Sequence, residues 1–112
     1  MSQTGTVYQA LQNRGLARGQ LAVSTAGHDT GRVYLIIDVM ENFVLCVDGD
    51  LRGLDKPKRK RWRHVRPLGA LEPGWEDRLA ALKDLGQKNA LVRNLIADHS
   101  GWIATNSTRS EP

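Results

Sequence analysis

Cysteine, aromatic residues and long apolar runs are all scarce in this sequence. Cys46 is the only cysteine among 112 residues, so the chain can form neither an internal disulfide nor a zinc site built from several thiolates. It lies within FVLCV, where we expect a small buried side chain rather than a reactive thiol. The longest apolar runs cover residues 33–37 and 43–47, far short of the roughly 18 residues of a membrane-spanning helix. We therefore expect no membrane segment.

Enzyme signatures are absent as well. His28, His64 and His99 lie far apart without metal-ligand spacing, and neither HExxH nor GxSxG occurs. The GHDTG stretch at residues 27–31 is too short for a nucleotide-binding fingerprint. It indicates a hairpin turn or, alternatively, a functional loop that offers backbone amides, His28 and Arg32 to a ligand. We expect no enzymatic activity, metal, cofactor or small-molecule substrate.

The bulk composition is that of one small globular domain. Hydrophobic residues make up 40% and charged residues 25% of the chain, which is ordinary for a soluble domain and too apolar for general disorder. The N-terminal MSQTGTVYQALQNRG lacks the basic start and apolar stretch of a secretory signal. We therefore expect a cytoplasmic protein.

Positive charge is concentrated in one segment. Residues 56–66 hold seven of the sixteen Lys and Arg residues and no carboxylate. The rest of the chain has nine cations against twelve carboxylates. A surface tuned only for solubility would intersperse the two signs, whereas a concentrated basic stretch is typical of a surface that binds a polyanion.

This basic stretch has three interpretations. It could be a solvated face, although its cations repel one another, or PKRKR could be a nuclear-localisation signal. We favour nucleic acid, because Lys and Arg neutralise phosphates and Trp62 lies among them as a flat ring for stacking. Trp62 could equally belong to the core, and the pattern leaves that choice open.

Alternating apolar residues predict three strands between residues 20 and 48, joined by turns at AGHDTG and MEN. Residues 60–66 are the candidate for a fourth strand, bracketed by Pro57 and Pro67. Because three strands alone would leave open edges, we expect closure into a small barrel.

Helical spacing begins beyond Pro67. Trp75, Leu79 and Leu82 form one stripe, for which Gly86 is the expected stop. A second stripe follows Asn89 as its expected N-cap and ends near residues 100–101. We predict a flexible extension over residues 1–18, a barrel over 19–67, a helical extension over 68–103 and a disordered tail over 104–112.

Two segments resemble a known family. GQLAVSTAGHDTGRVYLIIDVMENFVLCVDG, residues 19–49, is similar to a KOW motif, with a hairpin and a basic residue between two apolar strands. LRGLDKPKRKRWRHV, residues 51–65, resembles the extension found in small bacterial KOW-domain RNA-binding proteins. KNALVRNLIADH, residues 88–99, loosely resembles their C-terminal helix. Residues 1–18 and 69–86 are additions to the family pattern.

The resemblance implies an SH3-like barrel that binds RNA, with ribosomal RNA as the expected class, and that associates with the large ribosomal subunit in translation. The expected RNA contacts come from the KOW hairpin and the basic strip, namely His28, Asp29, Thr30, Arg32, Arg52, Lys56, Lys58, Arg59, Lys60, Arg61, Trp62, Arg63, His64 and Arg66. The alternatives are a protein-interaction module on the same barrel or a NusG-like transcription-associated factor.

Overall fold

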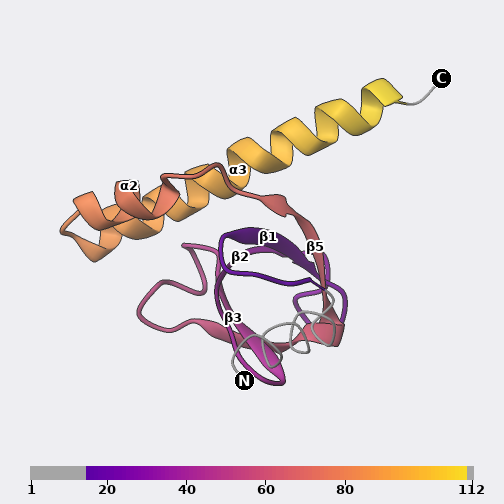
Figure 1. Cartoon of the computed structure of the whole chain (residues 1–112), viewed down its shortest axis with the longest axis horizontal. Coiled ribbons are helices and arrows are strands. Elements are labelled where there is room, and N and C mark those ends of the chain that lie inside the picture. The colour runs from indigo at the N-terminus through magenta and orange to yellow at the C-terminus, as the bar shows by residue number, and fades with distance from the viewer. Residues whose placement is uncertain (1–14, 111–112) are drawn as a thin grey trace, which may run out of the picture.

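The computed structural model describes residues 15–110, with side chains for residues 15–99. This part of the chain forms one antiparallel sheet of five strands, a 3-10 turn and two helices (Figure 1). The elements are β1 Gln20–Ser24, β2 Val33–Val39, β3 Phe43–Val47, β4 Lys58–Arg61, η1 Trp62–His64, β5 Val65–Ala70, α2 Trp75–Ala81 and α3 Leu85–Ser110. A small domain built on a sheet agrees with the expected mainly β class.

The three strands expected in the first half of the chain are confirmed as β1, β2 and β3. They pair as antiparallel neighbours, with Leu21 opposite Leu35 and Leu35 opposite Val47. Side chains that lie directly opposite each other share a face of the sheet. Leu21, Leu35 and Val47 therefore form a row across one face, and all three are fully buried.

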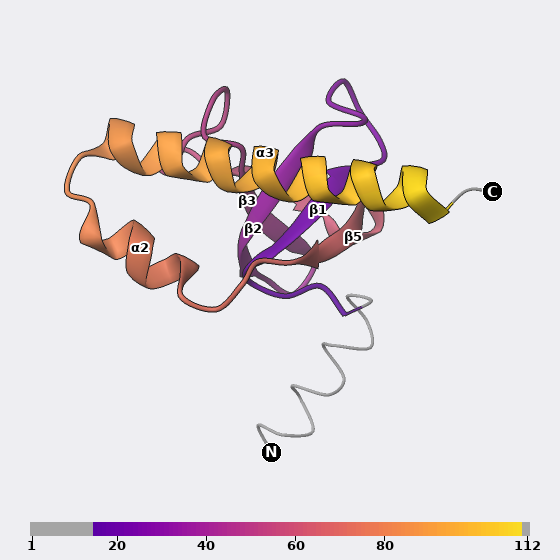
Figure 2. The same ribbon diagram turned by 90° about the horizontal axis from the view of Figure 1, so that it is seen from above.

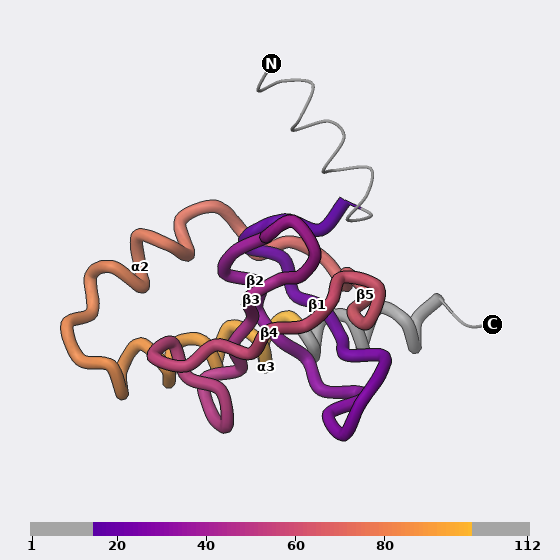
Figure 3. The backbone as a smooth tube through the Cα atoms, turned by 90° about the horizontal axis from the view of Figure 1, so that it is seen from below, coloured from indigo at the N-terminus to yellow at the C-terminus, as the bar shows by residue number. Residues whose placement is uncertain are grey.

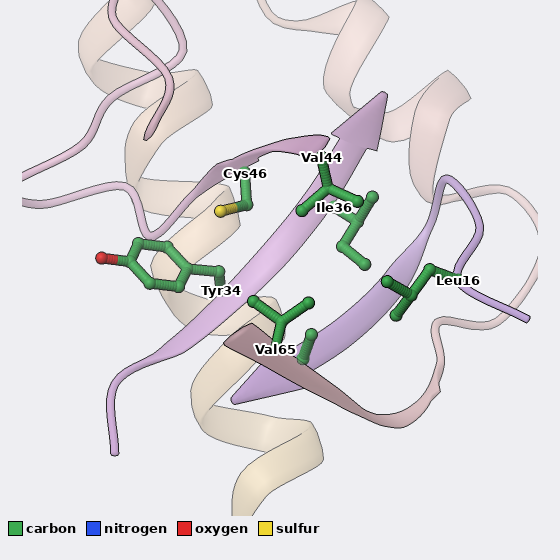
Figure 4. Packing of buried hydrophobic residues seen from close by; sticks show 7 residues of the cluster. Leu16, Tyr34, Ile36, Val44, Cys46 and Val65 are labelled. Atoms are coloured by element: carbon green, nitrogen blue, oxygen red, sulfur yellow. The ribbon is translucent and has the colours of Figure 1, made fainter. Parts of the chain in front are cut away.

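The sheet curls around its other face. Its strand order is β4-β3-β2-β1-β5, which puts β4 and β5 at opposite edges, yet only the short turn η1 separates them in sequence (Figure 3). Inside the curl, Val65 of β5 packs in one cluster with Val44 and Cys46 of β3 (Figure 4). We call this the inner cluster, and its buried members are Leu16, Ala22, Tyr34, Ile36, Val44, Cys46 and Val65.

The expected single strand over residues 60–66 is wrong in its extent. Strand β4 begins at Lys58, ends at Arg61 and pairs with β3, whereas β5 begins at Val65 and pairs with β1. The turn η1 interrupts them because it carries the chain from one edge of the sheet to the other. Pro67 lies inside β5 and is tolerated there because β5 is an edge strand.

The helices cover the outer face of the curl, and the expected pair packed on the sheet is confirmed. Figure 2 shows α3 lying across the strands. Trp75 of α2 and Val92 of α3 pack against the row of buried leucines and Val47. We call this the outer cluster, and its buried members are Leu21, Leu35, Val47, Trp75 and Val92.

Helix α3 begins earlier and ends later than expected. Gly86, the expected stop of the preceding helix, lies inside α3, and α2 ends at Ala81. Helix α3 also includes residues 104–110, where we expected disorder. Its N-cap is Asp84, whose Oδ2 accepts a hydrogen bond from the backbone N–H of Gln87 at 3.0 Å. Asn89, the expected cap, lies inside the helix and uses its side chain elsewhere.

No helix in residues 15–110 is both long and apolar enough to cross a membrane.

The folded domain begins before Gly19. Leu16 is only 4% exposed and belongs to the inner cluster. The Arg18 Nε donates to Glu76 at 2.6 Å, which ties the start of the sheet to α2. Residues 15–18 are therefore part of the packed structure and not of a flexible extension. The rest of that expected extension, residues 1–14, and residues 111–112 lie outside the described residues.

Candidate nucleic-acid interface

The basic strip is divided between the two faces of β4. Lys60 lies opposite Val44, an inner-cluster residue, so its side chain points into the curl. Arg59 and Arg61 alternate with it and point outward, where both are exposed. The seven cations of the strip therefore do not form one continuous charged face.

Lys60 is buried in a polar network at the end of the β1–β2 hairpin. Its side chain is 8% exposed, and its Nζ donates to the carbonyl of Ala26 at 2.8 Å and to Asp29 Oδ1 at 3.0 Å. Asp29 also accepts from Ser24 Oγ at 2.8 Å and from the Tyr34 hydroxyl at 2.6 Å. Lys60 and Asp29 thus hold the hairpin against β4, and neither presents its charge at the surface.

The environment of this network sets the protonation of its members. Burial would raise the pKa of Asp29, but hydrogen bonds from Tyr34, Lys60 and Ser24 outweigh burial and hold that pKa well below its usual range. Burial and the bond to Asp29 raise the pKa of Tyr34. Burial also raises the pKa of Cys46 to about 12, against an opposing effect of Lys60. Cys46 is therefore a buried, protonated thiol at neutral pH, as expected.

Arg32 is also engaged within the domain. Its Nη1 donates to Asp48 Oδ2 at 2.9 Å. Asp48 is 7% exposed, and its Oδ1 accepts from the backbone N–H groups of Asp50 and Arg52. Burial would raise the pKa of Asp48, but these three donors lower it. The pair shapes the β3–β4 loop, and its arginine remains 36% exposed.

The other expected hairpin residues are at the surface. His28 and Thr30 are both exposed in the turn between β1 and β2. Thr30 Oγ1 donates to the Gly27 carbonyl at 2.6 Å, and Gly27 and Gly31 have φ of 93° and 92°. The hairpin turn predicted from GHDTG is confirmed, with glycine where the backbone needs a positive φ.

The six remaining strip cations have no carboxylate partner within residues 15–99. Within residues 15–99 the ion pairs join Arg18 to Glu76, Arg32 to Asp48 and Lys60 to Asp29. None involves the six other cations of the strip, all exposed or half-buried, which are Lys56, Lys58, Arg59, Arg61, Arg63 and Arg66. Arg52 is half-buried and is likewise outside these pairs. Charge remains available for an external anion.

Trp62 packs against the inner cluster. It is half-buried in η1, between the two edges of the sheet. This packing supports the core interpretation over a stacking platform. His64 is half-buried in the same turn, and its carbonyl accepts from the backbone N–H of Thr25 at 2.8 Å. This bond connects η1 to the end of β1.

Two residues that the sequence reasoning missed lie beside the outward arginines. Phe43 begins β3, and the Arg59 Cζ lies over its ring at 4.0 Å from the ring centre. Asn42, Phe43, Arg59 and Arg61 line a hollow of about 370 Å³. The signal for Phe43 was present, because it starts an alternating strand, but only the register of β3 with β4 identifies its neighbours.

Helix α3 holds the loop that leads into the strip. The Arg93 Nη1 donates to the Gly49 carbonyl at 2.5 Å, and Asn89 Oδ1 accepts from the backbone N–H of Leu54 at 3.0 Å. Gly49, with φ of 78°, packs so closely on α3 that a Cβ there would collide with the Asn89 carbonyl oxygen. The helix therefore fixes the path by which the chain enters β4.

A larger hollow of about 750 Å³ lies between the β5–α2 connection and α3. Its lining mixes Glu72, Arg78 and Asp98 with the apolar Leu71 and Trp75.

Among the described residues, no three His, Cys, Asp or Glu side chains are grouped so that they could hold a metal ion.

Comparison with known proteins adds no identification. No protein-family model matches the chain, and no curated protein matches its sequence.

Proposed function

We propose that the protein is a non-enzymatic RNA-binding protein that contacts the phosphate backbone through the outward part of the basic strip. The observation that carries this proposal is the set of six strip cations that have no carboxylate partner among the described side chains. Charges that served only the fold would be paired or spread out, whereas these are concentrated in residues 56–66, and all but the half-buried Lys58 are exposed. The main contacts are Lys56, Arg59, Arg61, Arg63 and Arg66. Lys58 lies opposite Cys46 and is half-buried, so it is placed at the margin together with Arg52, His28 and Thr30.

This proposal narrows the set of residues expected from the sequence. Lys60 and Asp29 neutralise each other inside the domain, so we assign them to the hairpin and not to RNA contact. Trp62 is assigned to the core. Arg32 shares its charge with Asp48 and would contribute less than a free arginine.

We further infer that the curled sheet is an SH3-like barrel of the KOW type. The strand order and the convergence of β4 and β5 at η1 support this, together with the resemblance of residues 19–65 to KOW-domain proteins. The same resemblance points to ribosomal RNA and the large ribosomal subunit as partners and to a place in translation in the cytoplasm. Phosphate contacts position such a protein without reading sequence, so no specific RNA sequence is assigned.

Two measurements test this function. We expect the purified protein to bind structured ribosomal RNA much more tightly than an acidic peptide of equal charge, because the closely spaced phosphates of RNA hold condensed counterions that are released on binding. In a sucrose gradient of cell lysate, we expect it to sediment with the large ribosomal subunit. The Arg78→Gln variant is the control for both measurements. It removes an exposed arginine of α2, outside the basic strip, so it should bind RNA and sediment as the unmodified protein does.

Preference for the acidic peptide would contradict the proposal and favour a protein-interaction module. Co-purification with RNA polymerase without ribosomal subunits would instead favour a NusG-like role. A protein that binds RNA tightly but stays at the top of the gradient would overturn the ribosomal assignment alone.

A further inference from the structure

The corner of the outer face at β3 and β4 lies beyond the cover of the helices. Val47, at the end of β3, is fully buried in the outer cluster. Leu45 and Phe43 continue the same face toward the start of β3, and both are only half-buried. Neither is part of the outer cluster or of the apolar residues packed against it. An aromatic ring therefore borders solvent where the basic strip passes.

Arg59 covers this ring. It lies opposite Leu45 in the ladder, which makes Phe43 its diagonal neighbour and brings the two side chains within reach. Its Cζ stands 4.0 Å from the ring centre, the distance of a stacked guanidinium. Because Arg59 is exposed, its guanidinium lies over Phe43 and is also accessible to solvent. A planar cation held in this way loses little freedom when a ligand stacks on it.

The surroundings add the groups that a nucleotide needs. Arg61 lies directly opposite Phe43 and points out of the same face. Asn42 precedes Phe43, and its amide can both donate and accept a hydrogen bond. Together with Phe43 and Arg59, these residues line the hollow of about 370 Å³, a volume within the usual range of small-ligand sites.

We propose that this corner binds one unpaired nucleotide of a single-stranded RNA segment. The base stacks on the outer face of the Arg59 guanidinium, and the adjacent phosphate meets Arg61. Stacking and cation–π contact of this kind accept any base, because every base has a π-face. Paired bases are stacked inside a helix and cannot enter the hollow, so the site favours loops and single strands over duplex. This inference rests on the proposed function and specifies which form of RNA is recognised.

The test separates base contacts from phosphate contacts. The probes are an oligouridylate of roughly ten nucleotides, a common site size, and an oligomer with the same phosphates and abasic sugars. We expect the protein to bind the first about tenfold more tightly. Arg59→Lys keeps the charge but loses the planar group, so it should bring the two affinities close together. Phe43→Leu should do the same by removing the ring beneath Arg59.

Arg63→Lys is the matched control, because Arg63 is an exposed strip arginine in η1 and should retain the tenfold preference. Equal affinities of the unmodified protein for the two oligomers would overturn the nucleotide site and leave phosphate binding intact. An undiminished preference in Arg59→Lys would also overturn it, whether or not Phe43→Leu folds. If neither oligomer nor structured RNA bound, the proposed function itself would fail.

Discussion

At the scale of single residues, the fold decides which charges are free. Arg59 and Lys60 are adjacent and both positively charged. Lys60 is buried in an ion pair with Asp29, whereas Arg59 is exposed and lies over the ring of Phe43. Sequence alone could locate the basic strip but could not divide it. Which cations are buried and which are exposed depends on the register of β4 with β3. In that register Lys60 lies opposite Val44, so its side chain points into the curl. Asp29, whose carboxylate receives Lys60, is 31 residues away in sequence.

The Asp29 network predicts a definite pH dependence of stability. Because the pKa of Asp29 is lowered on folding, the unfolded chain takes up a proton more readily as pH falls through the usual carboxyl range near 3.9. The stabilisation is therefore complete at neutral pH and is lost progressively below about pH 5. We expect Asp29→Asn to lower the free energy of unfolding by roughly 1–3 kcal/mol at pH 7 and by a smaller amount near pH 3, because the loss continues until the pH falls below the folded-state pKa, which lies well below the usual carboxyl range.

Urea denaturation across that pH range measures the effect. Asp50→Asn serves as the control, since it removes an exposed carboxylate outside the network, and it should cost much less at every pH. A deficit of Asp29→Asn that stayed constant from pH 7 to pH 3 would show that its carboxylate charge does not stabilise the fold.

At the scale of elements, the loop between β3 and β4 is held in place by α3. Gly49 combines a φ of 78° with close contact to the helix backbone, so a side chain there meets two separate obstacles. Gly31 has a similar φ of 92° but open space around it. A side chain at Gly31 would therefore cost only the free energy of the left-handed backbone conformation. The two glycines form a matched pair for measuring the docking of the loop on α3.

We expect Gly49→Ala to destabilise the protein clearly more than Gly31→Ala does. The left-handed backbone alone costs an alanine about 1–2 kcal/mol, and at Gly49 the collision with Asn89 and Arg93 is added to that cost. Urea denaturation of both variants gives the difference directly. Equal losses would mean that the loop is not packed on the helix as described.

The elements also show how far sequence patterns reach. Alternating apolar residues predicted β1, β2 and β3 correctly, because burial of one face demands that period. The break at η1 was missed, because a turn that carries the chain between the two edges of a curled sheet has no strong local signal. Asn89 was a sound candidate cap by residue type, but Asp84 takes that role and leaves Asn89 to bind Leu54. Tertiary contacts decided both cases.

The candidate site was foreseen in part. The basic residues were identified from composition, whereas Phe43 and Asn42 were not, since they lie in a different segment and meet Arg59 only through strand pairing. Trp62 was left open between core and platform, and its packing on the inner cluster supports the core.

At the scale of the whole molecule, the arrangement joins a mildly acidic body to one exposed cationic edge. The helices cover the outer face of β1 and β2, and the inner cluster fills the curl. The exposed arginines that form no ion pair with any described side chain lie along β4, η1 and the start of β5. Binding through such an edge is dominated by release of counterions from phosphates, so it must weaken steeply as salt rises.

The dependence of RNA affinity on salt tests this account most directly. If about five phosphates are engaged, a plot of log affinity against log salt should have a slope of about −3 to −5. Replacing Arg59, Arg61 and Arg63 together with glutamine should reduce the magnitude of that slope by about 2–3. Arg78→Gln should leave the slope unchanged. A triple variant that retained the full slope would contradict the claim that these arginines form the RNA-binding surface.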